Sequence, residues 1–164
     1  MLCVMLLTGC TGNPSEKGLE YLQNKDYDNA ISEFEKAIKK DINVADAYRG
    51  IGMAKWEQED YQGCLDAMNS ALDAGAASDG TLYNLMGCSA LKLENYGDAI
   101  TYFEKTLEDT DISDDLKKEA SYNLILAYEG NGDTDTVKAK LAEYVEKYPD
   151  DEAASKAYEF WSTR

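Results

Sequence analysis

The chain has 164 residues, 44% of them hydrophobic, which is enough for one folded domain with a core. Lys and Arg number 16 against 32 Asp and Glu, and the resulting net charge of −16 argues against nucleic-acid binding, because phosphate recognition needs clustered cations. The chain contains no histidine, so it cannot form a Ser-His-Asp site, a Cys-His site or a histidine-ligated metal site. We therefore expect neither an enzyme nor a cofactor-dependent protein.

The N-terminal segment is short and apolar. Residues 1–7 contain no charged or polar side chain other than a cysteine, but they are far fewer than the roughly 20 residues that a membrane-spanning helix needs. The small residues Thr8 and Gly9 follow at once, and this order is typical of a signal peptide. We predict a signal peptide over 1–9. The alternative is an apolar stretch that packs on the folded body.

Leu7-Thr8-Gly9-Cys10 resembles the lipobox of bacterial lipoproteins. The resemblance implies that Cys10 carries a diacylglyceryl group and is the first residue of the mature chain. The body would then be tied to the extracytoplasmic face of a cell membrane, or to the outer membrane in a Gram-negative source. Residues 10–12 would form the lipidated cysteine and a short linker, whose reach at about 3.5 Å per residue is roughly 10 Å.

The body repeats with a period near 34 residues. Tyr27-Asp28-Asn29-Ala30 recurs 34 residues on as Tyr61-Gln62-Gly63-Cys64, and 35 residues further as Tyr96-Gly97-Asp98-Ala99. Such a period predicts stacked supersecondary units, because one unit cannot bury its apolar face alone. A small residue recurs as Gly18, Gly52 and Gly87, and a large one recurs as Phe34, Met68 and Phe103. Gly18 and Ala30 are predicted to lie where the two helices of the first unit cross, and Phe34 is predicted to fill the space to the neighbouring unit.

This pattern resembles the tetratricopeptide repeat (TPR), a helix-turn-helix of 34 residues. The resemblance implies an all-α fold, an α-solenoid of about four repeats over 13–150 with a C-terminal capping helix over 151–164. The fourth repeat diverges, because Ile125, Val137 and Tyr144 stand where the family has small residues. The predicted repeats lie near 11–44, 45–78, 80–113 and 118–151.

Helix-capping residues agree with this register. Asn13-Pro14 predicts a helix start, with Asn13 as the N-cap and proline at the first helical position. Ser113 is a second predicted N-cap, and Gly75 is predicted to end a helix. In the final helix an apolar stripe at helical spacing is predicted to cover the end of the stack, and it consists of Ala154, Ala157, Tyr158 and Trp161.

The TPR resemblance also implies a concave groove, lined by the first helix of each repeat, that binds a protein or peptide partner. Trp56, Met53 and Arg49 are the most notable cluster, since Trp and Arg are enriched at binding hot spots and Met adapts to irregular partners. The alternative is that Trp56 packs back onto its own array. The predicted groove residues are Leu19, Arg49, Met53, Trp56, Asn84, Cys88, Leu91, Asn123 and Leu126.

Two further patterns predict structural roles and not a disulfide or a metal site. Cys64 replaces a buried alanine and is predicted to be a core residue, whereas Cys88 projects from the groove side, so we expect no disulfide between them. The acidic segment 109–115 lacks the glycine and glutamate of a calcium loop and is predicted to connect two repeats.

The sequence therefore predicts a lipid-anchored interaction scaffold on the outer face of the bacterial cell envelope. The alternative function is a structural subunit of an envelope assembly, of the type that supports pilus or outer-membrane-protein assembly. In the scaffold the groove would bind the partner, whereas in the subunit the outer faces and the termini would matter more.

Overall fold

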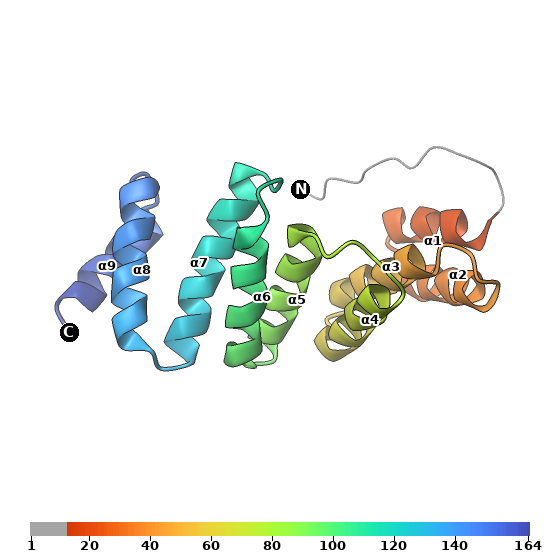
Figure 1. Cartoon of the computed structure of the whole chain (residues 1–164), viewed down its shortest axis with the longest axis horizontal. Helices are drawn as coiled ribbons and strands as arrows, with labels where there is room; N and C mark the ends of the chain where they lie inside the picture. Colours follow the sequence, from red (N-terminus) through yellow and green to blue (C-terminus); the bar gives the residue numbers. More distant parts are fainter. Residues whose placement is uncertain (1–12) are drawn as a thin grey trace. The chain divides into compact units, whose positions relative to one another are not determined.

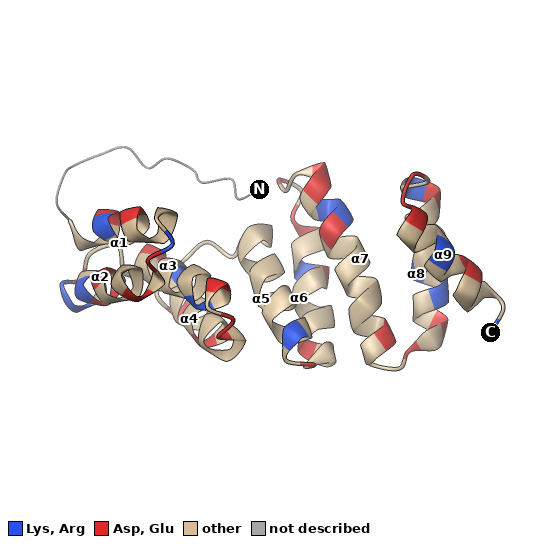
Figure 2. Cartoon of the chain, turned by 180° about the vertical axis from the view of Figure 1, so that it is seen from behind, with Lys and Arg blue, Asp and Glu red and all other residues tan. Residues whose placement is uncertain are grey.

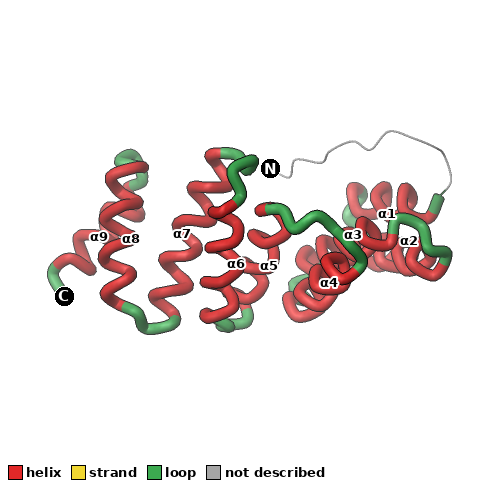
Figure 3. The backbone as a smooth tube through the Cα atoms, in the orientation of Figure 1, coloured by secondary structure: helices red, strands yellow, loops and turns green. Residues whose placement is uncertain are grey.

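The structure is a computed structural model, and it describes residues 13–164; the predicted signal peptide and the lipidation site Cys10 lie outside the described residues. All regular structure in the described part is α-helical, which confirms the predicted fold class (Figures 1 and 3). The helices are α1 (Pro14–Gln23), α2 (Tyr27–Lys39), α3 (Val44–Glu57), α4 (Tyr61–Asp73), α5 (Gly80–Lys92), α6 (Tyr96–Glu108), α7 (Asp114–Gly130), α8 (Thr134–Lys147) and α9 (Glu152–Ser162).

The chain divides into two compact units at Ala76 and Ala77. Unit 1 contains α1–α4 and unit 2 contains α5–α9. Within each unit every helix packs against its neighbour in the chain, and the first helices of successive hairpins also touch, α1 with α3 and α5 with α7. Each unit is therefore a short stack of helical hairpins in which the first helices lie side by side.

The turns inside the four hairpins share the same backbone geometry. The residue after the first helix's C-cap adopts a positive φ: 61° at Lys25, 61° at Glu59, 59° at Glu94 and 80° at Gly132. The next residue donates its backbone N–H to a carbonyl five positions earlier, for example Asp60 to Lys55 at 2.9 Å. This is the Schellman motif, and it delivers the chain directly into the N-cap of the second helix.

The recurring small and large residues meet in the cores. A Cβ atom added to Gly18 would lie 2.6 Å from the ring of Phe34, and one added to Gly87 would lie 2.7 Å from the ring of Phe103. Both rings are at most 1% exposed. The glycines therefore let the two helices of a hairpin approach closely enough for one aromatic side chain to fill the space between them.

The fourth hairpin builds its core from the residues that depart from the repeat pattern. Ile125, Val137 and Tyr144 are all buried, and they form one cluster with Leu141 of α8 and Ala154 of α9. Larger side chains replace the close glycine contact and fill the crossing of α7 and α8. The departure is thus compensated within the same hairpin.

The predicted capping residues are confirmed at both kinds of helix end. Asn13 Oδ1 accepts the backbone N–H of Ser15 at 2.7 Å, and Ser113 Oγ accepts that of Leu116 at 3.2 Å. Gly75 ends α4 with a φ of 89°. The backbone at these ends is therefore set by local sequence.

The last helix, α9, packs on α8 with a narrower stripe than the sequence predicts. Ala154 is fully buried, and Ala157 and Trp161 flank the same cluster. Tyr158, expected in the stripe, is 36% exposed, and Phe160 is 50% exposed. Tyr158 was wrongly predicted, because α9 has a helix on only one side within the described chain, so only the residues that face α8 are covered.

Candidate interaction faces on the first helices

In unit 2 the predicted groove residues of α5 and α7 lie directly opposite one another. Asn84 Nδ2 donates to Glu119 Oε1 at 3.3 Å, and one turn further along Asn123 Nδ2 donates to Cys88 Sγ at 3.7 Å. We call this surface the α5–α7 face, and it consists of Asn84, Cys88, Leu91, Glu119, Asn123 and Leu126. The two contacts are rungs of a polar ladder between adjacent first helices.

The ladder combines hydrogen-bonding groups with apolar side chains. Cys88 and Leu91 also pack against the core cluster of α5, α6 and α7, so one side of each is held in place. Leu91 and Leu126 follow Cys88 and Asn123 by three residues and share their helix faces. Asn84 Oδ1 is buried and accepts no hydrogen bond from the described residues. The face therefore presents two carboxamides between fixed apolar neighbours.

In unit 1 the predicted groove residues are half-buried side chains of α1 and α3. We call this surface the α1–α3 face, defined by Leu19, Arg49, Met53 and Trp56. Leu19 packs against the core cluster around Phe34 and so serves the core as well as the surface. The sequence placed these residues on one side of two helices, and the two helices are indeed in contact.

Trp56 turns toward its own hairpin. Its ring lies 5.1 Å, centroid to centroid, from that of Tyr61 on α4, with the two planes tilted by 59°. This contact agrees with the alternative that Trp56 packs back onto the array. The ring remains partly exposed, so it is a fixed aromatic edge rather than a fully buried core residue.

A shallow depression lies beside the start of α5 and the end of α6. Its volume is about 690 Å³, and Lys105 Nζ lies there 4.8 Å above the ring of Tyr83. Asp109 accepts the backbone N–H of Gly80 at 2.6 Å, and its backbone hydrogen bonds hold the pKa of Asp109 below its usual value. These contacts hold α5 against α6 and the loop that follows it, so we interpret the residues of the depression as packing contacts between helices and not as a binding site.

The other perturbed ionisable groups are helix-capping aspartates, partly or fully buried tyrosines, and Glu33 beside Lys36. The ion pair and hydrogen bond with Lys55 lower the pKa of Asp60, the N-cap of α4, and burial raises the pKa of Tyr128 to about 12. Both shifts keep the group in its ordinary charge state near neutral pH. Within residues 13–164 no three Cys, Asp or Glu side chains converge as metal ligands.

A search of the same residues finds no helix with the length and hydrophobicity needed to cross a bilayer.

The family model of the tetratricopeptide repeat matches residues 15–79 and 84–152. The chain belongs to the tetratricopeptide repeat family. The two matched segments correspond to α1–α4 and to α5–α8 with the start of α9. The repeat pattern read from the sequence is thereby confirmed.

Solved structures share the fold at low sequence identity. YrrB, described as a TPR protein with an unusual peptide-binding site, is 22% identical, has a TM-score of 0.79, and the match covers 92% of this chain and 75% of YrrB. MamA from Desulfovibrio magneticus RS-1 is 17% identical with a TM-score of 0.77 over 94% of this chain and 87% of MamA. The family and these neighbours support the coarse prediction of a protein-interaction scaffold, a class that is generally not enzymatic.

Proposed function

We propose that the protein holds a protein or peptide partner against the first helices of its hairpins, principally on the α5–α7 face. The observation that carries the proposal is the pair of rungs in which Asn84 meets Glu119 and Asn123 meets Cys88. Side chains from two neighbouring helices are thereby aligned along one strip. YrrB, of similar fold, is described as binding peptides, which supports this use of a TPR surface.

The chemistry of the strip favours an extended peptide. Each carboxamide nitrogen has two N–H groups and uses one in its rung, so the second N–H of Asn84 and of Asn123 can donate to the C=O groups that an extended main chain leaves unpaired. Leu91 and Leu126 offer apolar contact beside them. Glu119 adds a negative charge, which favours a partner with a lysine or arginine near this point.

The test of the face is site-specific photo-crosslinking in cells. A photoreactive amino acid at Leu126 should capture the partner, and Asn84→Ala with Asn123→Ala should reduce that capture at least tenfold. Asn69→Ala is the matched control, because Asn69 is exposed on the second helix α4. Equal capture by the double variant and the control would refute binding at the α5–α7 face.

We propose further that Cys10 carries a lipid and that the body acts on the extracytoplasmic face of a bacterial membrane. The support is the motif Leu7-Thr8-Gly9-Cys10 after a short apolar run. Two acyl chains would make the attachment stable, since a single chain holds only marginally. Intact-mass analysis of the membrane-extracted protein tests this, and an unmodified chain of residues 1–164 would refute it.

A structural subunit of an envelope assembly is the second candidate function. Phe160 and Tyr158 favour it, because these large hydrophobic side chains are exposed on α9. Single exposed aromatic residues are common, but two on one short helix suit a contact at the end of a stack. A stoichiometric complex that survives purification and is lost with Phe160→Ser would favour the subunit. Varied, substoichiometric clients that persist in Phe160→Ser would favour the scaffold.

A further inference from the structure

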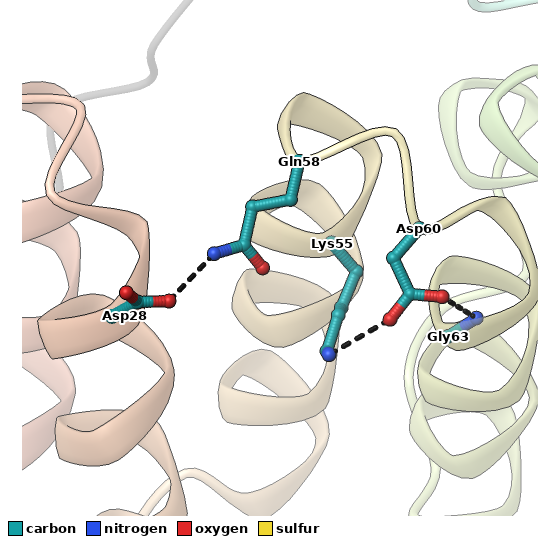
Figure 4. A network of polar contacts seen from close by, with 5 residues as sticks. All are labelled: Asp28, Lys55, Gln58, Asp60 and Gly63. Atoms are coloured by element: carbon teal, nitrogen blue, oxygen red, sulfur yellow. Dashed lines mark hydrogen bonds and ion pairs between the residues drawn. The ribbon is translucent and has the colours of Figure 1, made fainter.

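The last helix differs from the rest of the described surface in what it leaves exposed. At the turn of the second hairpin, polar groups pair within the chain: Lys55 Nζ lies 2.8 Å from Asp60 Oδ2, and Gln58 Nε2 donates to Asp28 Oδ1 at 2.7 Å (Figure 4). The large hydrophobic side chains that the described residues leave exposed are instead on α9. The surface of α9 is therefore the one that most favours a further contact.

One side of α9 is a continuous strip of small and aromatic side chains. Ala153, Ala157, Phe160 and Arg164 follow one another at spacings of three or four residues, so they share a helix face. Ala153 and Phe160 are exposed, and Ala157 borders the cluster that joins α9 to α8. We call these four residues the α9 strip. Tyr158 points about 160° away from Phe160 around the helix and lies outside the strip.

The ring of Phe160 is held in place although it is 50% exposed. The guanidinium carbon of Arg164 lies 3.6 Å from its centroid, and the ring of Trp161 meets it edge-on with the centroids 5.6 Å apart. Trp161 is in turn packed against the core cluster of α7, α8 and α9. A side chain that is already restrained loses little freedom on binding, and aromatic residues and arginine are enriched at protein interfaces.

The charges of α9 favour an antiparallel second copy as the partner of this strip. Its start carries the exposed carboxylates Asp150 and Glu152, and its end carries Arg164; Figure 2 shows red and blue segments along the helix. Two parallel copies would bring like charges together, whereas two antiparallel copies bring the arginine of each beside the acidic start of the other. Lys156 and Glu159 share one flank of the strip, and the antiparallel pairing places each level with the opposite charge of the other copy.

The shape of the strip is also self-complementary. Ala153 and Ala157 are one helical turn apart, and their small side chains leave room between them for the ring of Phe160 from an antiparallel copy. Such a contact is isologous, so two-fold symmetry repeats it and brings the two Ala157 side chains together near the axis. Small residues at this position let two helices approach to the usual distance of about 8–10 Å.

We propose that two copies of the protein associate through their α9 strips as an antiparallel, two-fold symmetric pair. The inference goes beyond the proposed function and needs neither the α5–α7 face nor a lipid on Cys10. One helix of 11 residues offers less area than the roughly 1,200 Å² of a stable interface, so the pair is transient in dilute solution. The net charge of −16 on each copy opposes association, but at physiological salt charges more than about 8 Å apart are largely screened, whereas the paired charges of the strip are closer.

The experiment traps the pair with a disulfide across the two-fold axis. The full chain with Ala157→Cys is expressed in bacterial cells, which are treated with copper phenanthroline and analysed by non-reducing electrophoresis. Every variant also carries Cys88→Ser, which removes the half-buried native thiol of unit 2. Ala139→Cys is the matched control, because Ala139 is an exposed alanine on the neighbouring helix α8. We expect several-fold more dimer with Ala157→Cys than with Ala139→Cys, and equal trapping at the two positions would overturn the proposal.

Further substitutions in the Ala157→Cys chain test which contacts form the pair. Phe160→Ser should reduce trapping several-fold, whereas Tyr158→Ser, which changes an exposed aromatic residue outside the strip, should leave it unchanged; circular dichroism checks that both remain folded. Equal trapping with Phe160→Ser and Tyr158→Ser would refute the use of the strip.

A charge exchange tests the antiparallel arrangement. Lys156→Glu should weaken trapping, and adding Glu159→Lys should restore it, because the exchange recreates both pairs between the copies. Failure of the exchange to restore trapping would contradict this arrangement. Mass spectrometry of the trapped band identifies the occupant: a second copy supports the proposal, whereas a different protein overturns it and favours the assembly-subunit function.

Discussion

Phe34 of α2 lies between two glycines on different helices, and this contact gives the sharpest test of the packing. Its ring is 1% exposed and is bounded by Gly18 of α1 and Gly50 of α3. A Cβ atom added at position 50 would lie 2.5 Å from Cε2 and 2.8 Å from Cε1 of the ring. A ring held from both sides cannot move away as a flexible side chain would, so Gly50→Ala should overpack the core.

The size of the effect follows from two opposing contributions. Overpacking a close-packed core costs about 1–3 kcal/mol, and three ring carbons inside the normal contact distance place this case at the upper end. Alanine gains about 1 kcal/mol over glycine in a helix interior. Gly50→Ala should therefore lower the free energy of unfolding by about 2 kcal/mol. Urea unfolding followed by Trp56 fluorescence in a Trp161→Phe background reports unit 1 by itself.

The control is Gly97→Ala on α6, where an added Cβ meets nothing within 4 Å; because Gly97 lies in unit 2, its unfolding is followed by Trp161 fluorescence in a Trp56→Phe background. This variant should be stabilised by up to about 1 kcal/mol. Replacing the ring in the double variant Gly50→Ala with Phe34→Leu should recover part of the loss, because the two changes are in direct contact. If Gly50→Ala gained stability as Gly97→Ala does, the close approach of α2 and α3 around Phe34 would be refuted.

Three further predictions follow from the turns and the caps. Glu94 has a φ of 59° in the turn between α5 and α6, so Glu94→Gly should raise the free energy of unfolding by about 0.5–1 kcal/mol in urea titrations, and a loss would contradict the left-handed geometry. Burial and the hydrogen bond donated to Glu104 raise the pKa of Tyr128 to about 12, above an unfolded value near 10, so the stability that it contributes is lost as pH rises from about 10 to 12. Tyr128→Phe should remove that loss when unfolding is followed by circular dichroism at each pH; an unchanged alkaline limb would argue against it. The backbone N–H of Ala154 lowers the pKa of Asp151, so the stability from this carboxylate is present above about pH 4 and is lost as pH falls through the lowered value. Asp151→Asn should keep the cap and flatten the acid limb of the same measurement, and an acid limb as steep as in the wild type would contradict this account.

The repeat period was enough to predict most of the fold. Positions 34 or 35 residues apart predicted the hairpins, and the small residue Gly18 was predicted to lie where two helices cross, which agrees with its close approach to the ring of Phe34. Asn13 and Ser113 predicted helix starts that the backbone hydrogen bonds confirm. These features are local or periodic, so the sequence contains them directly.

The candidate faces were only partly predictable. The sequence placed Asn84 and Asn123 on the same side of successive first helices, but the partners Glu119 and Cys88 depend on how far α7 slides along α5. A shift of α7 along α5 by one residue would carry both pairs of side chains beyond hydrogen-bonding distance. Where residues are inserted between two hairpins, the repeat pattern does not determine this shift. Trp56 illustrates the same limit, since its contact with Tyr61 depends on a rotamer that packing selects.

The sequence by itself determined that this protein is an all-α array of TPR hairpins, which residues cap its helices, and which small residues lie at its helix crossings. It did so because helix periodicity, capping and close packing act through neighbours in the chain or through a fixed repeat length. Tertiary structure alone decided which side chains meet across α5 and α7 and that Tyr158 of α9 is left exposed. Those outcomes depend on which helix faces are covered and by how much, a property of the assembled stack rather than of any one segment.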